Sequence, residues 1–251
     1  MNFSPTFFRV ELVRQARNPF TLIFTLAMPV VMYVIFGATP EYSDVMAGRG
    51  NVAFTVMTSM AAFGTATAMT SLTSLAASEF ARGWGRQLAL TPLTVAGYAL
   101  TKVLVALAYS TLSVVVVFLV GAATGARPTE GWVWLAAGAI ILAGGCMFGL
   151  FGLGMGMLFS SEGASGLASI MITFFSFFGN VFMPLSGVML DIAKFTPMYG
   201  YNALARWPQL EGGIDAVHSD PLWAILLNVA AWTVVFAGLV VIGTRRVRAR
   251  Q

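Results

Sequence analysis

Charged residues, glycines and a helix-like apolar pattern occur together in one short polar segment, residues 78–92, between two long hydrophobic runs. Glu79, Arg82 and Arg86 recur there at intervals of three and four residues, so on a short helix they would share one face. The apolar side chains between them would turn toward the bilayer or the rest of the protein. We predict a docking helix on the membrane surface; the alternative is an ordinary loop that its arginines hold in the cytosol.

Motifs for catalysis and cofactor binding are missing from the rest of the sequence. No glycine precedes a lysine, so there is no Walker A loop and this chain is expected not to hydrolyse ATP. His218 is the only histidine and cannot form a metal site alone. Lys102 lies close enough to the edge of a hydrophobic run for its amine to reach water. We therefore expect no catalytic, cofactor-binding or metal-binding residue, and no ion-coupled transport.

Composition identifies a membrane protein. Of the 251 residues, 58% are hydrophobic and only 10% are charged, against about 25% charged residues in soluble domains. No polar segment is long enough for a separate soluble domain, so residues 1–251 are predicted to form a single transmembrane domain. The net charge of +4 comes from basic residues near the ends of hydrophobic runs, which membrane topology explains better than nucleic-acid binding.

The hydrophobic runs predict six transmembrane helices and hence an all-α integral membrane protein. Each run is close to or above the roughly 20 residues that cross a bilayer. The runs cover residues 20–37, 52–77, 95–120, 132–159, 164–183 and 222–243. Six spans place both termini on one side. Of the 14 Lys and Arg residues, four fall on the other side: Arg49, Arg127, Lys194 and Arg206. Because basic residues concentrate on the cytosolic side, both termini are predicted to be cytosolic. The protein is predicted to lie in the cell membrane.

Residues 1–19 are predicted to form an interfacial helix before the first span. Phe8 and Leu12 belong to an apolar series that repeats every four residues, and Glu11 and Gln15 lie on the opposite face. A helix with this pattern would rest on the membrane with its polar face in water.

Two of the predicted spans have a polar face made of small side chains. In the fifth span the intervals are four, four, three and four residues, which keeps the polar groups on one side of a helix. Such a face would line a translocation path or form the seam with a second copy of the chain. The residues are Thr55 and Ser59 in the second span and Ser165, Ser169, Thr173, Ser176 and Asn180 in the fifth.

The fourth span contains two pairs of glycines four residues apart. They are Gly145 with Gly149 and Gly152 with Gly156. Small residues at this spacing let two membrane helices approach closely, so we predict a helix-packing seam and not a nucleotide-binding loop.

Residues 184–221 are too long for a hairpin and too apolar at their start for a solvated loop. Pro184 and Pro197, together with Pro208, are expected to break any continuous helix. We predict a re-entrant or surface-lying segment on the outer side, in which Pro184, Ser186, Pro197 and Tyr199 are the residues of interest.

The order of these features resembles the type-2 ATP-binding-cassette (ABC) exporter permeases over nearly the whole chain. The matching residues are Glu79-Phe80-Ala81-Arg82-Gly83, Leu90-Thr91-Pro92-Leu93 and Lys102, followed by Met183-Pro184-Leu185-Ser186, Thr196-Pro197-Met198-Tyr199 and Arg206. The resemblance implies that Glu79, Arg82, Gly83 and Arg86 couple to an ATPase subunit. It also implies two ATPase copies, a second permease chain of the same or a homologous kind, and a substrate route beside the first, second and fifth spans. The chain departs from the family at Gly83-Trp84-Gly85, which puts helix continuity there in question.

The expected function is export of an amphipathic small molecule, such as a drug, an antibiotic or a lipid-like compound, with a separate ATPase subunit. Export of a glycan or lipid-linked glycan by the same architecture is the alternative, although it would call for more aromatic surface along the route. An ATP-independent carrier or an intramembrane enzyme is the alternative of another class.

Overall fold

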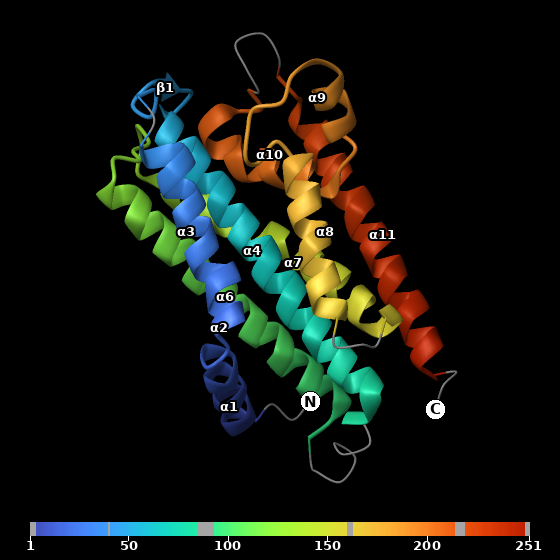
Figure 1. Cartoon of the computed structure of the whole chain (residues 1–251). Coiled ribbons are helices and arrows are strands. Elements are labelled where there is room, and N and C mark those ends of the chain that lie inside the picture. The colour runs from blue at the N-terminus through green and yellow to red at the C-terminus, as the bar shows by residue number, and fades with distance from the viewer. Residues whose placement is uncertain (1–3, 40, 85–92, 160–162, 214–218, 249–251) are drawn as a thin grey trace.

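The structure is a computed structural model that describes residues 4–39, 41–84, 93–159, 163–213 and 219–248. Its long helices run side by side along one axis (Figure 1). The first described helix, α1, and the last part of α11 lie at one end, which we call the α1 end. Helices α9 and α10 lie at the opposite end, together with a short β-hairpin, and we call this the α10 end.

The elements follow the hydrophobic runs closely. They are α1 (Pro5–Ala16); a helical run made of α2 (Pro19–Leu22), η1 (Ile23–Ala27), α3 (Met28–Tyr33) and η2 (Val34–Ala38); the hairpin strands β1 (Met46–Ala47) and β2 (Gly50–Asn51); α4 (Val52–Glu79) with a terminal turn η3 (Phe80–Trp84); α6 (Val95–Ala123); α7 (Trp132–Phe159); α8 (Ala164–Phe177); α9 (Gly187–Ala193); α10 (Pro197–Leu210); and α11 (Leu222–Arg248).

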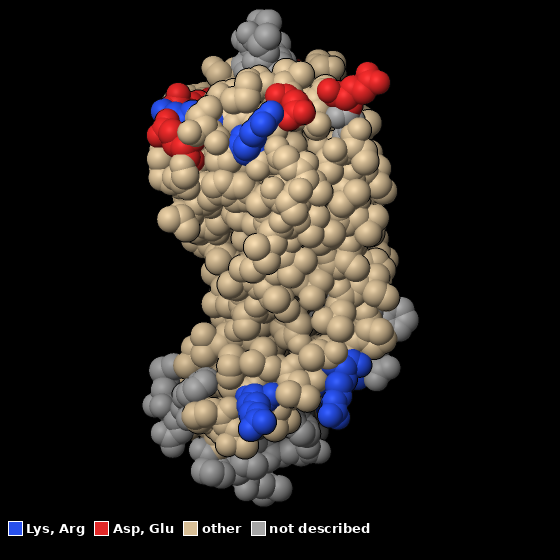
Figure 2. Space-filling model, turned by 90° about the vertical axis from the view of Figure 1, so that its left-hand side faces the viewer, with Lys and Arg blue, Asp and Glu red and all other residues tan. Residues whose placement is uncertain are grey.

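Four helices in the described part of the chain are long and apolar enough to cross a bilayer. They are Val52–Gly83, Val95–Ala123, Trp132–Phe159 and Leu222–Val247. The apolar helices Ile23–Ala38 and Ala164–Phe177 are shorter. On the face shown in Figure 2, charged side chains gather at the two ends and a broad uncharged belt separates them, as expected for a chain that spans a membrane.

Helix α4 is the centre of the bundle. It packs against α3, α6, α7, α8 and α10, and most of its residues are buried. Small and hydroxyl side chains let its neighbours come close, and the hydroxyls bond to backbone oxygens. Thr70 Oγ1 donates to the carbonyl of Phe148 at 3.2 Å, and Thr73 Oγ1 lies 2.9 Å from that of Gly149. Both threonines are fully buried, so these bonds join α4 to α7 inside the bundle.

The glycines of α7 form the other half of this contact. A Cβ atom at Gly145 would meet Thr65, one at Gly149 would meet Met69, and one at Gly156 would meet the carbonyl of Ser74. Each of these contacts is with α4. The helix-packing seam predicted from the glycine pairs is therefore confirmed.

The helical run 19–38 contains a proline in its middle, and a side chain from another helix bonds the carbonyl that this proline cannot. Pro29 has no N–H, so it cannot donate to the carbonyl of Thr25 four residues earlier. The hydroxyl of Ser113, on α6, donates to that carbonyl at 2.7 Å. Gly64 of α4 leaves room for this arrangement, because a Cβ atom there would collide with Ser113 and crowd Pro29.

The fifth hydrophobic run is a shorter helix than predicted. Helix α8 ends at Phe177 and not at residue 183. Asn180 has a φ of 55°, a left-handed conformation that asparagine tolerates and that cannot continue a helix. Its side chain accepts a bond from the N–H of Leu185 at 2.9 Å, and its carbonyl accepts one from Asn202. Asn180 therefore belongs to a turn and leaves the helical face formed by Ser165, Ser169 and Thr173.

The described residues of the segment 184–221 form two helices, α9 and α10. Ser186 precedes α9, and Pro197 is the first residue of α10, where its missing N–H costs nothing. The hydroxyl of Thr196 caps α10 by accepting from the N–H of Tyr199 at 3.3 Å. Our expectation for Pro208 was wrong, since it lies within the last turn of α10.

Replacing Gly152 by alanine should destabilise the fold. The new Cβ atom would collide with the carbonyl oxygen of Thr70 and the hydroxyl of Thr73, and such overpacking costs about 1–3 kcal/mol. Gly138→Ala on the same helix is the control, because its Cβ atom would meet Phe118 at an ordinary 3.5 Å. Thermal unfolding of both purified variants in one detergent provides the measurement. Equal melting temperatures would contradict the α4–α7 seam.

Candidate functional site

A cluster of four charged side chains lies at the α1 end, and two of them, Lys102 and Glu11, are buried. Lys102 Nζ on α6 is 2.8 Å from Glu11 Oε2 on α1 and 2.9 Å from Glu79 Oε2 on α4. Arg14 extends the cluster, with one nitrogen 2.8 Å from Glu79 and the other 3.0 Å from Glu11. The helices α1, α4 and α6 therefore share one set of ion pairs, which we call the α1-end cluster.

Aromatic side chains enclose the cluster. The hydroxyl of Tyr98 donates to the carbonyl of Ala76 at 3.1 Å and to Glu79 at 3.4 Å. Lys102 Nζ lies 5.2 Å from the centre of the Tyr98 ring and 6.0 Å from that of Phe7, in reach of cation–π attraction. Because the side chains of Lys102 and Glu11 are each only 6% exposed, solvent screens these charges little.

This arrangement corrects two expectations from the sequence. Lys102 does not reach out to water but is paired inside the protein. The polar face of α1 also points inward, since Glu11 and Gln15 are each 4% exposed whereas Val10 is 56% exposed. Helix α1 thus contacts the bundle through Glu11 and Gln15 as well as through Phe8 and Leu12, which pack against the core.

The predicted coupling residues occupy different positions. Glu79 turns into the α1-end cluster, whereas Arg82 is exposed one turn further along. Gly83 has a φ of 106°, so the helix breaks where the Gly83-Trp84-Gly85 sequence raised the question. Residues 85–92, including Arg86, lie outside the described residues. The turn η3 therefore begins immediately after Glu79, whose side chain is held by its ion pairs with Lys102 and Arg14.

In the described part of the chain, the polar side chains predicted for residues 165–180 do not share one environment. Thr173 is exposed, and Ser165 and Ser169 are partly buried. Ser169, Thr173 and Ser176 each donate to a carbonyl one turn earlier in α8. The buried side of α8 is instead formed by Ala164, Ala168, Ile172 and Ser176.

Thr55 and Ser59 meet α10 and not α8. Thr55 Oγ1 accepts from Gln209 Nε2 at 2.8 Å, and Ser59 Oγ accepts from Arg206 Nε at 2.6 Å. Gln209 also donates to the carbonyls of Ala47 and Asn51 at 3.0 and 3.1 Å, which fixes the β-hairpin to α10.

A cavity of about 480 Å³ opens at this junction, and we call it the α10-end cavity. Its polar residues come from α4, the turn after α8, and α10. Its apolar wall comes from α4 and the segment that follows Asn180. Among the residues that line it are Thr55, Val56, Asn180, Phe182, Pro184 and Arg206.

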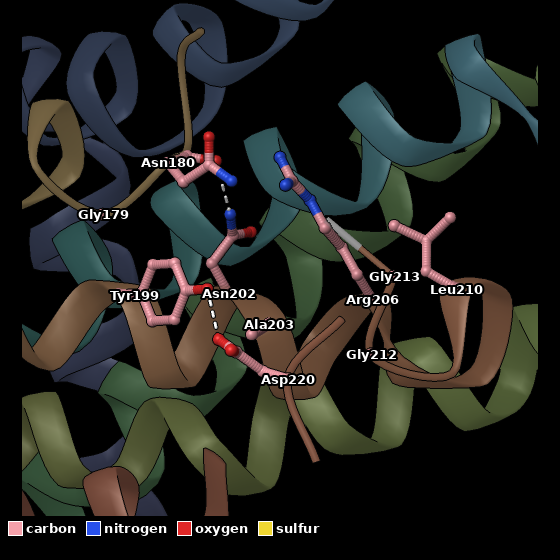
Figure 3. Close-up of a pocket in the computed structure, with 10 residues that line it drawn as sticks. All are labelled: Gly179, Asn180, Tyr199, Asn202, Ala203, Arg206, Leu210, Gly212, Gly213 and Asp220. Carbon is pink, nitrogen blue, oxygen red and sulfur yellow. Dashed lines mark hydrogen bonds between the residues drawn. The ribbon is translucent and has the colours of Figure 1, made fainter. Parts of the chain in front are cut away.

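Arg206 lies between this cavity and a small pocket next to it, where Figure 3 shows its guanidinium pointing away from Asp220. Asp220 is already bound by Lys194 at 2.9 Å and by the hydroxyl of Tyr199 at 2.5 Å. Burial lowers the pKa of Arg206 to about 10, although Tyr199 acts in the opposite direction, so the side chain stays charged at neutral pH. Burial, followed by the bond to Asp220, raises the pKa of Tyr199.

Several residues of both sites were missed in the sequence. Glu11 could have been noticed as a possible partner of Lys102, because Lys102 lies in an otherwise apolar helical run and a buried amine needs a carboxylate. Gln209, Asn202 and Asp220 gave no such signal, since their partners are distant in sequence. Pro184 lines the α10-end cavity, whereas Ser186 and Pro197 start helices.

Replacing Lys102 by methionine should strongly destabilise the protein. Glu11 and Glu79 would lose their shared cation, and breaking a buried ion pair costs about 3–5 kcal/mol. The control is Arg14→Gln, because the side chain of Arg14 is 44% exposed and the loss of an exposed pair costs less than about 1 kcal/mol. Thermal unfolding would be compared for both variants. An equal fall in melting temperature for the two variants would contradict the α1-end cluster. So would a melting temperature that does not recover when Glu11→Gln is added to Lys102→Met.

Comparison with known proteins agrees with this architecture. Residues 6–207 match the family model described as "ABC-2 type transporter". A protein of Bacillus subtilis (strain 168) described as "Putative transport permease YvfS" is 26% identical over 230 residues, which cover 90% of this chain and 90% of that protein. The matched residues extend from α1 into α10, and the resemblance to type-2 ABC permeases is confirmed. The chain is a multi-pass membrane protein that belongs to the ABC-2 type transporter family.

Proposed function

We propose that this chain is the membrane-spanning subunit of an ATP-driven exporter, with six spans and both termini in the cytosol. The four long helices would be joined by the run 19–38 and by α8, which also extend between the two ends (Figure 1). The α1 end would face the cytosol, because most arginines of the described chain lie there. These are Arg9, Arg14, Arg17, Arg82, Arg245, Arg246 and Arg248.

The observation that carries this proposal is the α1-end cluster. A partner ATPase that pushes on η3 and the residues after it would act on the end of α4 at Glu79. The ion pairs of Glu79 with Lys102 and Arg14 would pass that displacement to α6 and α1. Because α4 packs against most of the other helices, its movement would change the packing of the whole bundle. Glu79 would thus act as a positioning residue behind η3, with Arg82 on the docking surface.

The rest of the transporter would come from other chains. Two ATPase subunits would hold ATP and Mg²⁺, and a second permease chain, identical or homologous, would complete the route. The partly exposed hydroxyls of Ser165, Ser169 and Thr173 would line that route or the contact between permeases. An amphipathic small molecule fits a bundle in which polar side chains are small and most of the surface is apolar.

Purification of the tagged chain from its native membrane in mild detergent should bring down an ATPase. The expected partner is a soluble chain with a Walker A loop, present in stoichiometric amount. Its absence from a chain that remains folded would reject the proposal and favour an ATP-independent carrier.

Replacing Glu79 by glutamine should weaken coupling in the assembled complex. Stimulation of ATP hydrolysis by a panel of amphipathic compounds is expected to fall about 2- to 30-fold, as for a loss of about 0.5–2 kcal/mol of coupling. Basal hydrolysis and co-purification of the ATPase should persist. Glu130→Gln, an exposed carboxylate at the α10 end, is the matched control and should leave stimulation intact. Unchanged stimulation in Glu79→Gln would remove Glu79 from the coupling pathway.

A further inference from the structure

We propose that the α10-end cavity binds an anionic amphiphile. Arg206 pairs with its phosphate or carboxylate group, and the apolar wall of the cavity contacts its hydrocarbon part. This inference rests on the proposed transport function and specifies the class of molecule that the permease recognises. The shared chemistry is one anionic group joined to an apolar chain, whether that molecule is a transported compound or a lipid of the surrounding membrane.

The charge of Arg206 is not balanced within the described part of the chain. No carboxylate among the described residues forms an ion pair with it, and its one hydrogen bond there is to the neutral hydroxyl of Ser59. Asp220 lines the same small pocket but is bound by Lys194 and Tyr199. A partly buried charge without a counter-ion is costly, and an anion bound beside it would remove that cost.

A second donor lies on the same cavity. Asn180 lines both the small pocket and the α10-end cavity, as Arg206 does. Its carbonyl oxygen Oδ1 is occupied by the N–H of Leu185, while its Nδ2 has no hydrogen-bond partner among the described residues. A planar guanidinium together with an amide N–H is a suitable donor set for the oxygens of a phosphate or carboxylate.

The remaining wall favours an amphiphile over a small inorganic anion. Val52, Val56, Val181, Phe182 and Met183 line the α10-end cavity beside Arg206. A cavity of about 480 Å³ is many times the size of one anion and has the dimensions of a small-molecule site. Met183 is 58% exposed at its mouth, so a hydrocarbon chain could extend from the cavity along the outer surface of the bundle.

The test measures binding to the complex in phosphatidylcholine nanodiscs without ATP. The probes are decyl phosphate, decanol and inorganic phosphate, each below its aggregation concentration, followed by tryptophan fluorescence. Decyl phosphate should bind at least about tenfold more tightly than decanol, since a hydrogen bond to a charged group supplies that difference. Inorganic phosphate should bind much more weakly than decyl phosphate. Equal affinities of the wild-type protein for decyl phosphate and decanol would overturn the proposal, and this comparison needs no variant.

Variants then assign the effect to Arg206. Arg206→Gln should abolish the preference for decyl phosphate, and Arg206→Lys should keep part of it. Arg127→Gln is the control, because Arg127 is an exposed arginine of the α10 end that is already paired with Asp44 at 2.9 Å. A preference that survives in Arg206→Gln, or that is lost equally in Arg127→Gln, would overturn the assignment.

Two further arms identify the source of the ligand and separate this proposal from the transport function. Weaker binding of decyl phosphate in phosphatidylglycerol nanodiscs would support a membrane lipid as the natural occupant. Stimulation of ATP hydrolysis by decyl phosphate that is lost in Arg206→Gln would support a transported molecule. Binding is measured without ATP, so it does not depend on an ATPase partner. Absence of that partner would reject the transport function, and the binding measurement would still test the anion site.

Discussion

Close approach of α4 and α7 is the constraint on which the rest of the structure depends. In a bilayer no hydrophobic force favours contact between two apolar helices, so short distances and hydrogen bonds must hold them together. The α7 glycines supply the short distance, and Thr70 and Thr73 of α4 supply bonds to α7 carbonyls. Once α4 is buried in this way, it is available as the common neighbour of α3, α6, α8 and α10.

Lys102 at the α1 end and Arg206 at the α10 end are cations in opposite situations, although other charges at the α10 end are paired. At the α1 end, Lys102 and Arg14 are matched by Glu11 and Glu79, so the charges fasten three helices to one another. At the α10 end, Arg206 is fixed by Ser59 while its charge faces a cavity. A matched set of charges is suited to holding a structure together, whereas an unmatched one is suited to binding something that arrives from outside.

Much of the helical framework could be predicted from the sequence, because long apolar runs have few other solutions in a bilayer. The glycine pairs of α7 also identified a packing seam, although spacing alone did not name α4 as the partner. The end of α8 could not be foreseen, since hydropathy continues through Val181–Met183. What stops the helix is the left-handed turn at Asn180, held by Leu185 and by Asn202 on α10.

The functional residues were harder to predict for a related reason. Lys102 looked like an edge residue, because its partner Glu11 lies 91 positions away. Arg206 looked like an ordinary arginine of an outer segment, and its contact with Ser59 spans 147 positions. Local spacing carries information about helix faces, but it does not show which face of a distant helix will lie opposite.

The hydrogen bond from Ser113 to the carbonyl of Thr25 links two positions in evolution. In a relative where Pro29 is replaced by a residue with an N–H, that carbonyl could again be bonded within its own helix, and the serine on α6 would become dispensable. Loss of the serine while the proline remains would instead remove the donor that compensates for it. The two substitutions should therefore be tolerated in one order and not in the other, so the history of the family would show the proline changing first.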